Sequence, residues 1–567
     1  MTHRVFVSGA AGFVGSHLCQ RLIQAGCEVH AVIRREDDEL ARLGVRMWVG
    51  DLWDAPTLKA ALSGVDIVIH CAGDPSFGNG PQYHRANVEL TRHLIDAVRT
   101  TCPGLQRFVF VSTIGAMDRP PGDSGARPLT EDSPAAPTSD YGRSKLQAEQ
   151  LVRESGVPFS VVRPTMVVGA DMRMDSHFAV FARHALRGSL MSRLAWPGRF
   201  SVIHVDDLAA ALWLTATHPE AQGKTFFCAG EPMSVAECFA QSAPQARRLP
   251  LAWATTLAAP LVRWLPFPLR AMLTPALTAS DQRLRQLGWI PRHSAQSALA
   301  EVIQREAARV SPELDPGGQT VITGAASGLG HALVERLAPL RKNVLLIDKD
   351  STGLQRLLDR YPHCRAVTAD LTDDAQLQQL TAQGAWVDQP ITELYACAGI
   401  GLRGRMQDLP FEAHQKMFKL NTLARLHLGQ AAIRTMRRRQ FGRVVFISSS
   451  SAFQPLPFMA TYAATNSALL SLGEAWAYET RDQGIQMMTV CPGGMQTNFQ
   501  KSGGVKEVEG EKLMPPSEVA EQILQGLRAQ RTTLIVSTRS LAMSLLARIL
   551  PRALSVRLWG TLMEKMR

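Results

Sequence analysis

Short apolar runs alternate with longer amphipathic stretches along most of the chain. Residues 4–35, RVFVSGAAGFVGSHLCQRLIQAGCEVHAVIRR, begin and end in apolar runs, with a glycine-rich turn and an amphipathic stretch between them. Apolar runs of about four to eight residues bounded by turn residues predict buried strands, and apolar residues at helical spacing predict a helix. Residues 4–35 are therefore expected to form a strand, a turn, a helix and a second strand.

The same order of elements occurs again at 319–350. In both copies the next strand ends in an acidic residue, and the one after it ends in a small-residue turn; these segments are 49–52 and 68–73, then 367–371 and 394–399. Strands that alternate with helices favour right-handed crossovers and a parallel sheet. The pattern predicts an α/β protein with two tandem, doubly wound parallel sheets of the Rossmann type.

The length of the chain, 567 residues, is too great for a single hydrophobic core and agrees with two domains. A polar segment rich in proline and glycine, RVSPELDPGGQT at 309–320, separates the two copies. The expected parts are a first domain at 1–308 with a small helical substrate region at about 165–305, a linker at 309–317, a second domain at 318–538 and an amphipathic helical tail at 539–567.

The charge pattern argues against a nucleic-acid-binding protein. The formal net charge is +11, but lysine and arginine are scattered, and no compact basic run alternates with aromatic residues. Pockets for anionic cofactors and a basic surface that favours anionic lipid are the simpler interpretation.

Cysteine usage and hydropathy predict the compartment. The nine cysteines form no C-x-x-C pair, so we expect reduced thiols, no metal site and a cytoplasmic protein. The N-terminus enters an apolar strand within three residues, which leaves no room for a signal peptide. The longest uncharged apolar run, about 14 residues, is shorter than the roughly 20 needed to cross a bilayer.

The two glycine-rich turns lie between a predicted strand and a predicted helix, where they can bind a dinucleotide. Glycines let the backbone approach a pyrophosphate, and the following helix presents its N-terminal N–H groups to the anion. The glycines are Gly9, Gly12 and Gly15 in the first copy and Gly324, Gly328 and Gly330 in the second.

The end of the second strand of each copy predicts which dinucleotide binds. An acid there bonds the adenosine ribose and repels a 2′-phosphate, whereas arginine does the reverse. Arg34 and Arg35 therefore favour NADP in the first domain, unless they are only surface charges, and Asp348 favours NAD in the second. Asp51 and Asp370 are expected near the adenine, with a helix-capping role as the alternative.

Further motifs carry a resemblance to a known family. The segments YGRSK (141–145), RFVFVST ending at Thr113, and HRANVEL with Asn87 occur in the first copy. The second copy has VVFISSSSAF, KLNTL and CPGGMQT. With the glycine-rich turns, these resemble two members of the short-chain dehydrogenase/reductase superfamily joined end to end. The first resembles the extended branch, particularly enzymes similar to 3β-hydroxysteroid dehydrogenases and epimerases, and the second resembles the compact branch.

The resemblance implies catalytic roles for a small set of residues. A tyrosine exchanges a proton with the substrate oxygen, a lysine four residues later favours its phenolate and holds the nicotinamide ribose, and a serine or threonine orients the substrate. In the first domain these are Tyr141, Lys145 and Thr113, with Ser112 as a structural neighbour. In the second, Tyr462 and Ser449 match the pattern, with Asn421 in the proton relay.

The resemblance also extends the set of expected cofactor-binding residues. In the first domain it adds Phe13, Val14, Leu52, Ala72 and Lys145. In the second it adds Ser327, Leu329, Leu371, Ala398, Gly399, Tyr462, Asn466, Pro492, Gly493 and Thr497.

The second domain departs from the family pattern at two positions. Cys397 stands where an amide side chain is usual, and Asn466 stands where the lysine is usual. Asparagine is neutral and cannot electrostatically favour a tyrosinate, an effect of about one to three pKa units. The sequence leaves three interpretations open: a weak or non-catalytic NAD-binding domain, which we favour, an active domain with another cation or a different proton route, or chemistry that needs no tyrosinate.

The substrate is expected to be hydrophobic. Residues 249–277 are apolar, interrupted by Arg263 and Arg270, and the tail at 539–567 is amphipathic with interspersed arginines. Residues 249–277 predict an apolar substrate pocket or contact with the inner face of a membrane. The tail predicts contact with the membrane or docking, either on the protein's own domain or in a homodimer.

The expected function is an NAD(P)-dependent oxidoreductase that interconverts a secondary alcohol and a ketone, or reduces a related carbonyl, on a sterol-like or long-chain substrate, mainly in the first domain. Two alternatives stay open. One is a two-step long-chain acyl-thioester reductase. The other is a nucleotide-sugar epimerase or dehydratase with the second domain as an interaction module.

Overall fold

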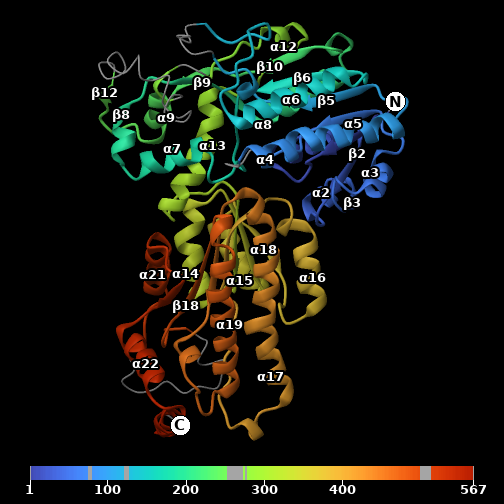
Figure 1. Cartoon of the computed structure of the whole chain (residues 1–567). Helices are drawn as coiled ribbons and strands as arrows, with labels where there is room; N and C mark the ends of the chain where they lie inside the picture. The colour runs from blue at the N-terminus through green and yellow to red at the C-terminus, as the bar shows by residue number, and fades with distance from the viewer. Residues whose placement is uncertain are drawn as a thin grey trace. The chain divides into compact units, whose positions relative to one another are not determined.

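The computed structural model describes residues 2–74, 79–119, 127–251, 272–274, 277–497 and 513–565. The chain forms two compact units, Met1–Ile303 and Gln304–Arg567, which are coloured blue to green and green to red in Figure 1. The division lies inside helix α13 (Ala295–Val310), shortly before the segment 309–317.

The first unit is built on a seven-stranded parallel sheet. Its order is β10 (Thr225–Cys228), β6 (Phe159–Pro164), β5 (Arg107–Val111), β4 (Ile67–His70), β1 (Arg4–Ser8), β2 (Glu28–Ile33) and β3 (Arg46–Val49). Every neighbouring pair is parallel. The strand order reverses between β1 and β4, which is where such sheets bind their ligands, at the carboxyl ends of the strands.

The second unit repeats this topology. Its order is β15 (Arg365–Thr368), β14 (Asn343–Asp348), β13 (Gln319–Thr323), β16 (Ile391–Ala396), β17 (Gly442–Ile447), β18 (Ile485–Cys491) and β19 (Thr533–Ile535), again parallel throughout. The prediction of two tandem, doubly wound sheets is confirmed. In each sheet the first strand, β1 or β13, lies between the second and the fourth, so the strand order reverses there.

Helices cover both faces of each sheet (Figure 1). In the first unit, α1 (Phe13–Gln24) and α8 (Val205–Thr217) pack on one face and α3 (Ala55–Leu62), α5 (Leu90–Thr101) and α6 (Asp140–Glu154) on the other. In the second, α14 (Gly328–Leu337), α15 (Ser351–Arg360) and α21 (Pro516–Arg528) oppose α16 (Asp374–Ala382), α18 (Arg425–Arg439) and α19 (Ala460–Glu479). The apolar strands are therefore buried on both sides, as their continuous hydrophobic runs require.

The two units share an unusual local feature beside their fourth strand. A six-residue π-helix occurs at His84–Glu89, between α4 (Gly80–Tyr83) and α5, and another at Lys419–Ala424, between α17 (Phe411–Phe418) and α18. Each π-helix contains the predicted asparagine, Asn87 or Asn421. Single-turn π-helices are frequent at functional sites.

The substrate region of the first unit has its own apolar core. It contains β7 (Met166–Val168), α7 (His177–Leu186), β9 (Arg199–His204), β11 (Pro232–Ser234), α9 (Val235–Ser242) and α12 (Gln282–Gln286). Phe178, Phe181, Phe200 and Phe239 pack together in it. Most of the apolar stretch predicted at 249–277 lies outside the described residues, namely 252–271, 275 and 276.

The C-terminal tail forms two helices, α22 (Thr538–Ile549) and α23 (Arg552–Lys565). Trp559 and Met563 are buried, and the Arg403 side chain donates a hydrogen bond to the carbonyl of Met563 at 3.0 Å. One side of the tail therefore docks on the second unit, while leucines on its other side are exposed. Among the described residues, no helix is both long and apolar enough to cross a membrane.

Candidate active sites

The glycine-rich turn of the first unit is closed so tightly that side chains are excluded. Gly9 has a φ of +73°, and a Cβ on Gly15 would lie 2.1 Å from the Gly9 carbonyl oxygen. Helix α1 follows with Gly12 as its N-cap, no side-chain cap and no acidic residue in its first turn. Phe13, Val14 and Gly15 open this helix, so its N–H groups suit a pyrophosphate.

The turn of the second unit has the same geometry. Gly324 has a φ of +66°, and a Cβ on Gly330 would lie 2.0 Å from the Gly324 carbonyl oxygen. Helix α14 begins after Ser327, whose side chain makes no capping hydrogen bond. Both units therefore offer an uncapped helix N-terminus behind a closed glycine turn, and both fit a dinucleotide.

The other predicted cofactor residues of the first unit also lie at carboxyl ends of strands. Arg34 and Arg35 follow β2, Asp51 and Leu52 follow β3, and Ala72 follows β4. Both arginines are exposed, and the Asp51 carboxylate accepts a hydrogen bond from the Trp53 N–H at 3.0 Å.

Tyr141 and Thr113 meet at the start of helix α6. Ser139 caps this helix and accepts a hydrogen bond from the Gly142 N–H, which places Tyr141 in the first turn. Burial raises the pKa of Tyr141 to about 12, while a hydrogen bond with the Thr113 hydroxyl acts to lower it. The ring of Tyr83, which the sequence analysis did not single out, lies 5.6 Å from that of Tyr141.

Lys145 is buried at the carboxyl end of β5. Its Nζ donates a hydrogen bond to the Val111 carbonyl at 2.9 Å and lies 5.0 Å from the centre of the Phe110 ring. Burial lowers its pKa to about 8. Its positive charge is therefore held at the end of this strand.

Ser112 has the structural role that the sequence left open for it. Its hydroxyl donates to Glu149 at 2.6 Å, and the fully buried Glu149 carboxylate also pairs with Arg163 at 2.6 Å. The side chain of the next residue, Thr113, lies instead beside Tyr141.

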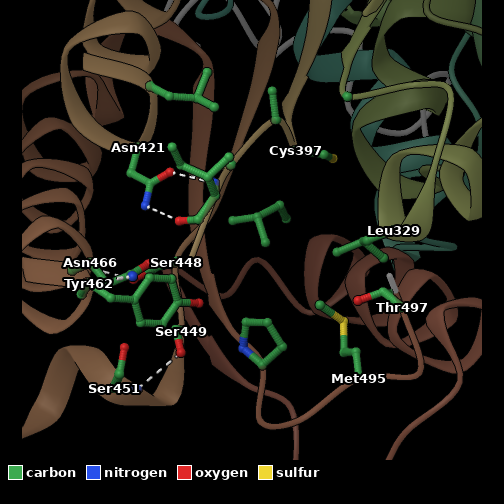
Figure 2. A pocket seen from close by; sticks show the side chains of 18 of the residues that line it. Leu329, Cys397, Asn421, Ser448, Ser449, Ser451, Tyr462, Asn466, Met495 and Thr497 are labelled. Carbon is green, nitrogen blue, oxygen red and sulfur yellow. Dashed lines mark hydrogen bonds between the residues drawn. The ribbon is translucent and has the colours of Figure 1, made fainter. Parts of the chain in front are cut away.

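All residues predicted for the second site line one cavity of about 710 Å³. They are Gly324, Ser327, Gly328, Leu329, Gly330, Asp348, Asp370, Leu371, Ala398, Gly399, Asn421, Ser449, Tyr462, Asn466, Pro492, Gly493 and Thr497. Figure 2 shows Tyr462 and Ser449 side by side, with Leu329 and Thr497 on the other side of the cavity. The side chains of Met459, Trp559 and Met563 close part of its wall.

The polar residues around Tyr462 are each held by hydrogen bonds to the protein backbone. Ser449 accepts a hydrogen bond from the Ser451 N–H at 3.1 Å, and the Asn466 amide donates to the Tyr462 carbonyl at 2.8 Å. Asn421 bonds both the N–H and the carbonyl of Ile400, as Figure 2 shows. Asn466 is thus anchored within its own helix.

The acids of the second unit are positioned by backbone N–H groups. Asp348 accepts hydrogen bonds from Ala326 at 2.9 Å and Asp350 at 3.0 Å, which ties the end of β14 to the glycine turn. Asp370 accepts from Thr372 at 2.9 Å. Both carboxylates line the cavity, in a position that suits the adenosine half of a dinucleotide.

One residue of the second cavity was missed by the sequence analysis. Arg425 is buried and lines the cavity, four residues after Asn421. A single arginine inside the otherwise uncharged stretch LNTLARLHLGQA was the available signal.

A histidine–carboxylate group lies in the first unit, where the sequence predicts no metal site. His204, Asp206 and His293 present ligand atoms within 4.8 Å of one another. His204 also contacts Glu301 at 3.3 Å and His293 contacts Asp207 at 3.1 Å, so each ring already has a carboxylate partner.

Comparison with known proteins gives two family matches. The model of the NAD dependent epimerase/dehydratase family matches residues 5–229, and the short chain dehydrogenase model matches residues 319–507.

Three curated relatives are all reductases. A 4-hydroxy-2-methyl-3-oxo-4-farnesyl-3,4-dihydroquinoline-1-oxide ketoreductase of Stigmatella aurantiaca is 31% identical over 41% of this chain and 70% of its own length. A 2-alkyl-3-oxoalkanoate reductase of Stenotrophomonas maltophilia is 32% identical over 41% of this chain and 73% of its own. A 3-ketodihydrosphingosine reductase of Bos taurus is 26% identical over 37% of this chain and 68% of its own.

Proposed function

Because the chain belongs to the short-chain dehydrogenase/reductase superfamily and is an NAD(P)-dependent oxidoreductase, we propose that its first unit interconverts a secondary alcohol and a ketone on a hydrophobic, long-chain or sterol-like substrate. The observation that carries the proposal is the hydrogen bond between the Tyr141 and Thr113 side chains, which lie beside the carboxyl end of the sheet.

The residues of the first unit divide the chemistry among them. The Thr113 hydroxyl orients the substrate oxygen, and Tyr141 gives that oxygen a proton in reduction or takes one in oxidation. Lys145 supplies positive charge from the end of β5, where its Nζ donates to the Val111 carbonyl and would also hold a ribose hydroxyl of the cofactor. When bound, the nicotinamide supplies or accepts the hydride at the substrate carbon.

The substrate class is supported by the apolar environment and by the relatives. The phenylalanine-rich core of the substrate region lies in the same unit as Tyr141. Two relatives act on ketones that, by their names, carry a farnesyl or an alkyl chain, and a third acts on 3-ketodihydrosphingosine. A 3-oxo group on a lipid chain is therefore the substrate that we propose.

The two units are proposed to prefer different cofactors. Arg34 and Arg35 are exposed after β2 and favour the 2′-phosphate of NADP, whereas Asp348 at the end of β14 favours the ribose of NAD. Titration of the full-length chain with each nucleotide tests this, using Gly15→Ala to weaken the first site and Gly330→Ala to weaken the second. Retention of NADPH binding in the first variant and its loss in the second contradicts the assignment.

The activity is tested by incubating the full-length protein with NADPH and either a 2-alkyl-3-oxoalkanoate or a 3-ketosteroid. We expect oxidation of NADPH that is lost in Tyr141→Phe and retained in Tyr462→Phe. Full activity of Tyr141→Phe contradicts the proposal. Release of thiol from a long-chain acyl-CoA instead supports the acyl-thioester reductase, and turnover of a UDP-sugar supports the epimerase.

A further inference from the structure

The second unit contains a buried cation close to the place where its missing lysine belongs. We propose that the guanidinium of Arg425 replaces the lysine ammonium and that the second unit is a working, tyrosine-dependent oxidoreductase site. This goes beyond the activity proposed for the first unit and rests only on the second unit's binding of a nicotinamide cofactor. It departs from the sequence-based interpretation that Asn466 leaves this unit weak or non-catalytic.

The first support is a shared anchor at the end of a strand. In the first unit, Lys145 donates to the carbonyl of Val111, the last residue of β5, at 2.9 Å. In the second unit, Arg425 donates to the carbonyl of Ile447, the last residue of β17, at 2.6 Å. The two strands occupy the same place in their sheets, and each is followed two residues later by the candidate hydroxyl.

The glycine that follows the fourth strand of each unit provides the second support. A Cβ on Gly73 would lie 3.2 Å from the Lys145 Nζ and 2.7 Å from the Asn87 side-chain oxygen. A Cβ on Gly399, the matching glycine after β16, would lie 2.6 Å from the Arg425 Nη2 and 3.3 Å from the Asn421 side-chain oxygen. The ammonium and the guanidinium therefore reach the same corner of the site from different helices.

The surrounding residues change in a way that makes room for the guanidinium. The position of Arg425, four residues after the π-helix asparagine, is Thr91 in the first unit, where Thr91 bonds His70 at 3.0 Å. The position of His70, three residues before the glycine, is Ala396 in the second unit. A smaller side chain on the strand thus accompanies a larger one on the helix, while Asn466 replaces the lysine.

The guanidinium is fixed by protein carbonyls. It donates to the carbonyls of Ala398 (2.7 Å from Nη2 and 3.2 Å from Nε), Asn421 (3.3 Å) and Ile447. These bonds use four of the five N–H groups of an arginine. The second Nη2 hydrogen has no acceptor in the described part of the chain and remains for a ribose or substrate hydroxyl at the cavity wall.

The positive charge of Arg425 acts on Tyr462 in the required direction. Burial raises the pKa of Tyr462, while the Ser449 hydrogen bond, the positive charge of Arg425 and the Asn466 amide act to lower it, and Cys491 acts to raise it. Burial lowers the pKa of Arg425 only to about 10, so the guanidinium stays protonated at neutral pH. Cys397 raises the pKa of Arg425, as Cys71 does for Lys145.

The proposed reduction needs one hydride donor, the reduced nicotinamide, and one proton donor, Tyr462. In reduction, a hydride from the reduced nicotinamide forms the new C–H bond as the carbonyl π bond breaks, and the Tyr462 proton forms the O–H bond. The tyrosinate left behind is stabilised by Arg425 until solvent returns a proton to it.

The test uses the full-length protein in a Tyr141→Phe background, which silences the first site. The chain has six tyrosines, so the titration of Tyr462 is obtained as the difference in tyrosinate absorbance between matched proteins with and without Tyr462→Phe. Arg425→Met is expected to raise the pKa of Tyr462 by about one to three units, and Arg425→Lys by much less. With NADH and a 3-oxooctanoyl thioester, kcat/KM should fall ~10- to 1000-fold in Arg425→Met.

A reciprocal variant keeps the test decisive if Arg425→Met does not fold. Arg425→Thr with Asn466→Lys restores the arrangement of the first unit and should leave the pKa of Tyr462 within about half a unit of the parent. If Arg425 is only structural, adding the lysine lowers this pKa by about a unit or more, which overturns the proposal. An unchanged pKa in Arg425→Met, shown to be folded by its circular dichroism spectrum and cooperative thermal unfolding, overturns it as well.

Discussion

At the residue scale, the two units place a buried cation at matching strand ends with two different side chains. Lys145 and Arg425 come from different helices and end at matching strand carbonyls. A cation within reach shifts a pKa through its distance and burial, not through its position in the sequence. A pentapeptide motif is therefore an incomplete description of such a site.

The neighbouring hydroxyls Ser112 and Thr113 provide a matched pair of variants. Thr113→Ala should lower kcat/KM of the first site by ~10- to 1000-fold, because it removes the hydroxyl that bonds Tyr141. Loss of its bond with the Gly115 N–H should cost at most about 1 kcal/mol of stability. Ser112→Ala should cost ~1–3 kcal/mol of unfolding free energy, because it removes the bond to buried Glu149. Steady-state kinetics and thermal unfolding of both variants check this; the reverse assignment contradicts the geometry.

The two cations should give the two sites different pH profiles. Burial lowers the pKa of Lys145 to about 8 and that of Arg425 to about 10. The charged form is lost as pH rises, so first-site kcat/KM should fall above about pH 8 while second-site kcat/KM persists to about pH 10. Rates measured in Tyr462→Phe and Tyr141→Phe proteins separate the two profiles. Identical profiles contradict this prediction.

At the element scale, each site depends on a strand-to-helix turn that excludes side chains. The turn brings the first helix's N-terminus to the point where the strand order reverses. A Cβ on Gly15 would overlap the Gly9 carbonyl, so the turn cannot close with any other residue.

Gly15→Ala should therefore abolish nucleotide binding at the first site while the second site still binds. Calorimetric titration of the full-length protein should show the loss of one of two binding events. Gly104→Ala is the control, because a Cβ there meets no atom within 4 Å. Loss of both binding events in Gly15→Ala points instead to general unfolding.

The tail helices present a surface that suits an anionic membrane. Leu541, Leu545 and Ile549 on α22 have exposed fractions of 45%, 50% and 80%, and Arg552 and Arg557 on α23 are exposed. Glutamate at the three apolar positions should abolish salt-sensitive co-sedimentation with phosphatidylglycerol vesicles. Leu190→Glu, at an exposed leucine of the first unit, is the control. If the native protein does not sediment but is a dimer that the triple variant dissociates, the surface is a dimer contact.

At the scale of the whole molecule, the second unit is stabilised by a buried ion network. Glu393 lies between Arg341 at 2.6 Å and Arg443 at 2.7 Å, with all three side chains almost fully buried. Arg443 also bonds the Ala308 carbonyl of helix α13. The network thus joins β16 and β17 to the helix in which the two compact units divide.

This network predicts how stability depends on pH. Burial acts to raise the pKa of Glu393, but the two arginines outweigh it and lower the pKa to about 2. The stabilisation should be complete above about pH 4.5 and lost as pH falls toward 2. Glu393→Gln should cost ~3–5 kcal/mol at neutral pH, because it leaves buried arginines unpaired. Calorimetric unfolding checks this, and a variant as stable as the parent contradicts it.

The sequence alone determined the repeated strand–helix alternation, the two glycine turns, and the tyrosine and serine positions. These features depend on local periodicity and turn chemistry, which act over a few residues. Only the tertiary structure decided that Ser112 bonds Glu149, that the tail docks through Trp559, and that Arg425 reaches the strand end beside Tyr462. Those contacts join residues far apart in the chain, and they depend on the space that packing leaves, as at Ala396.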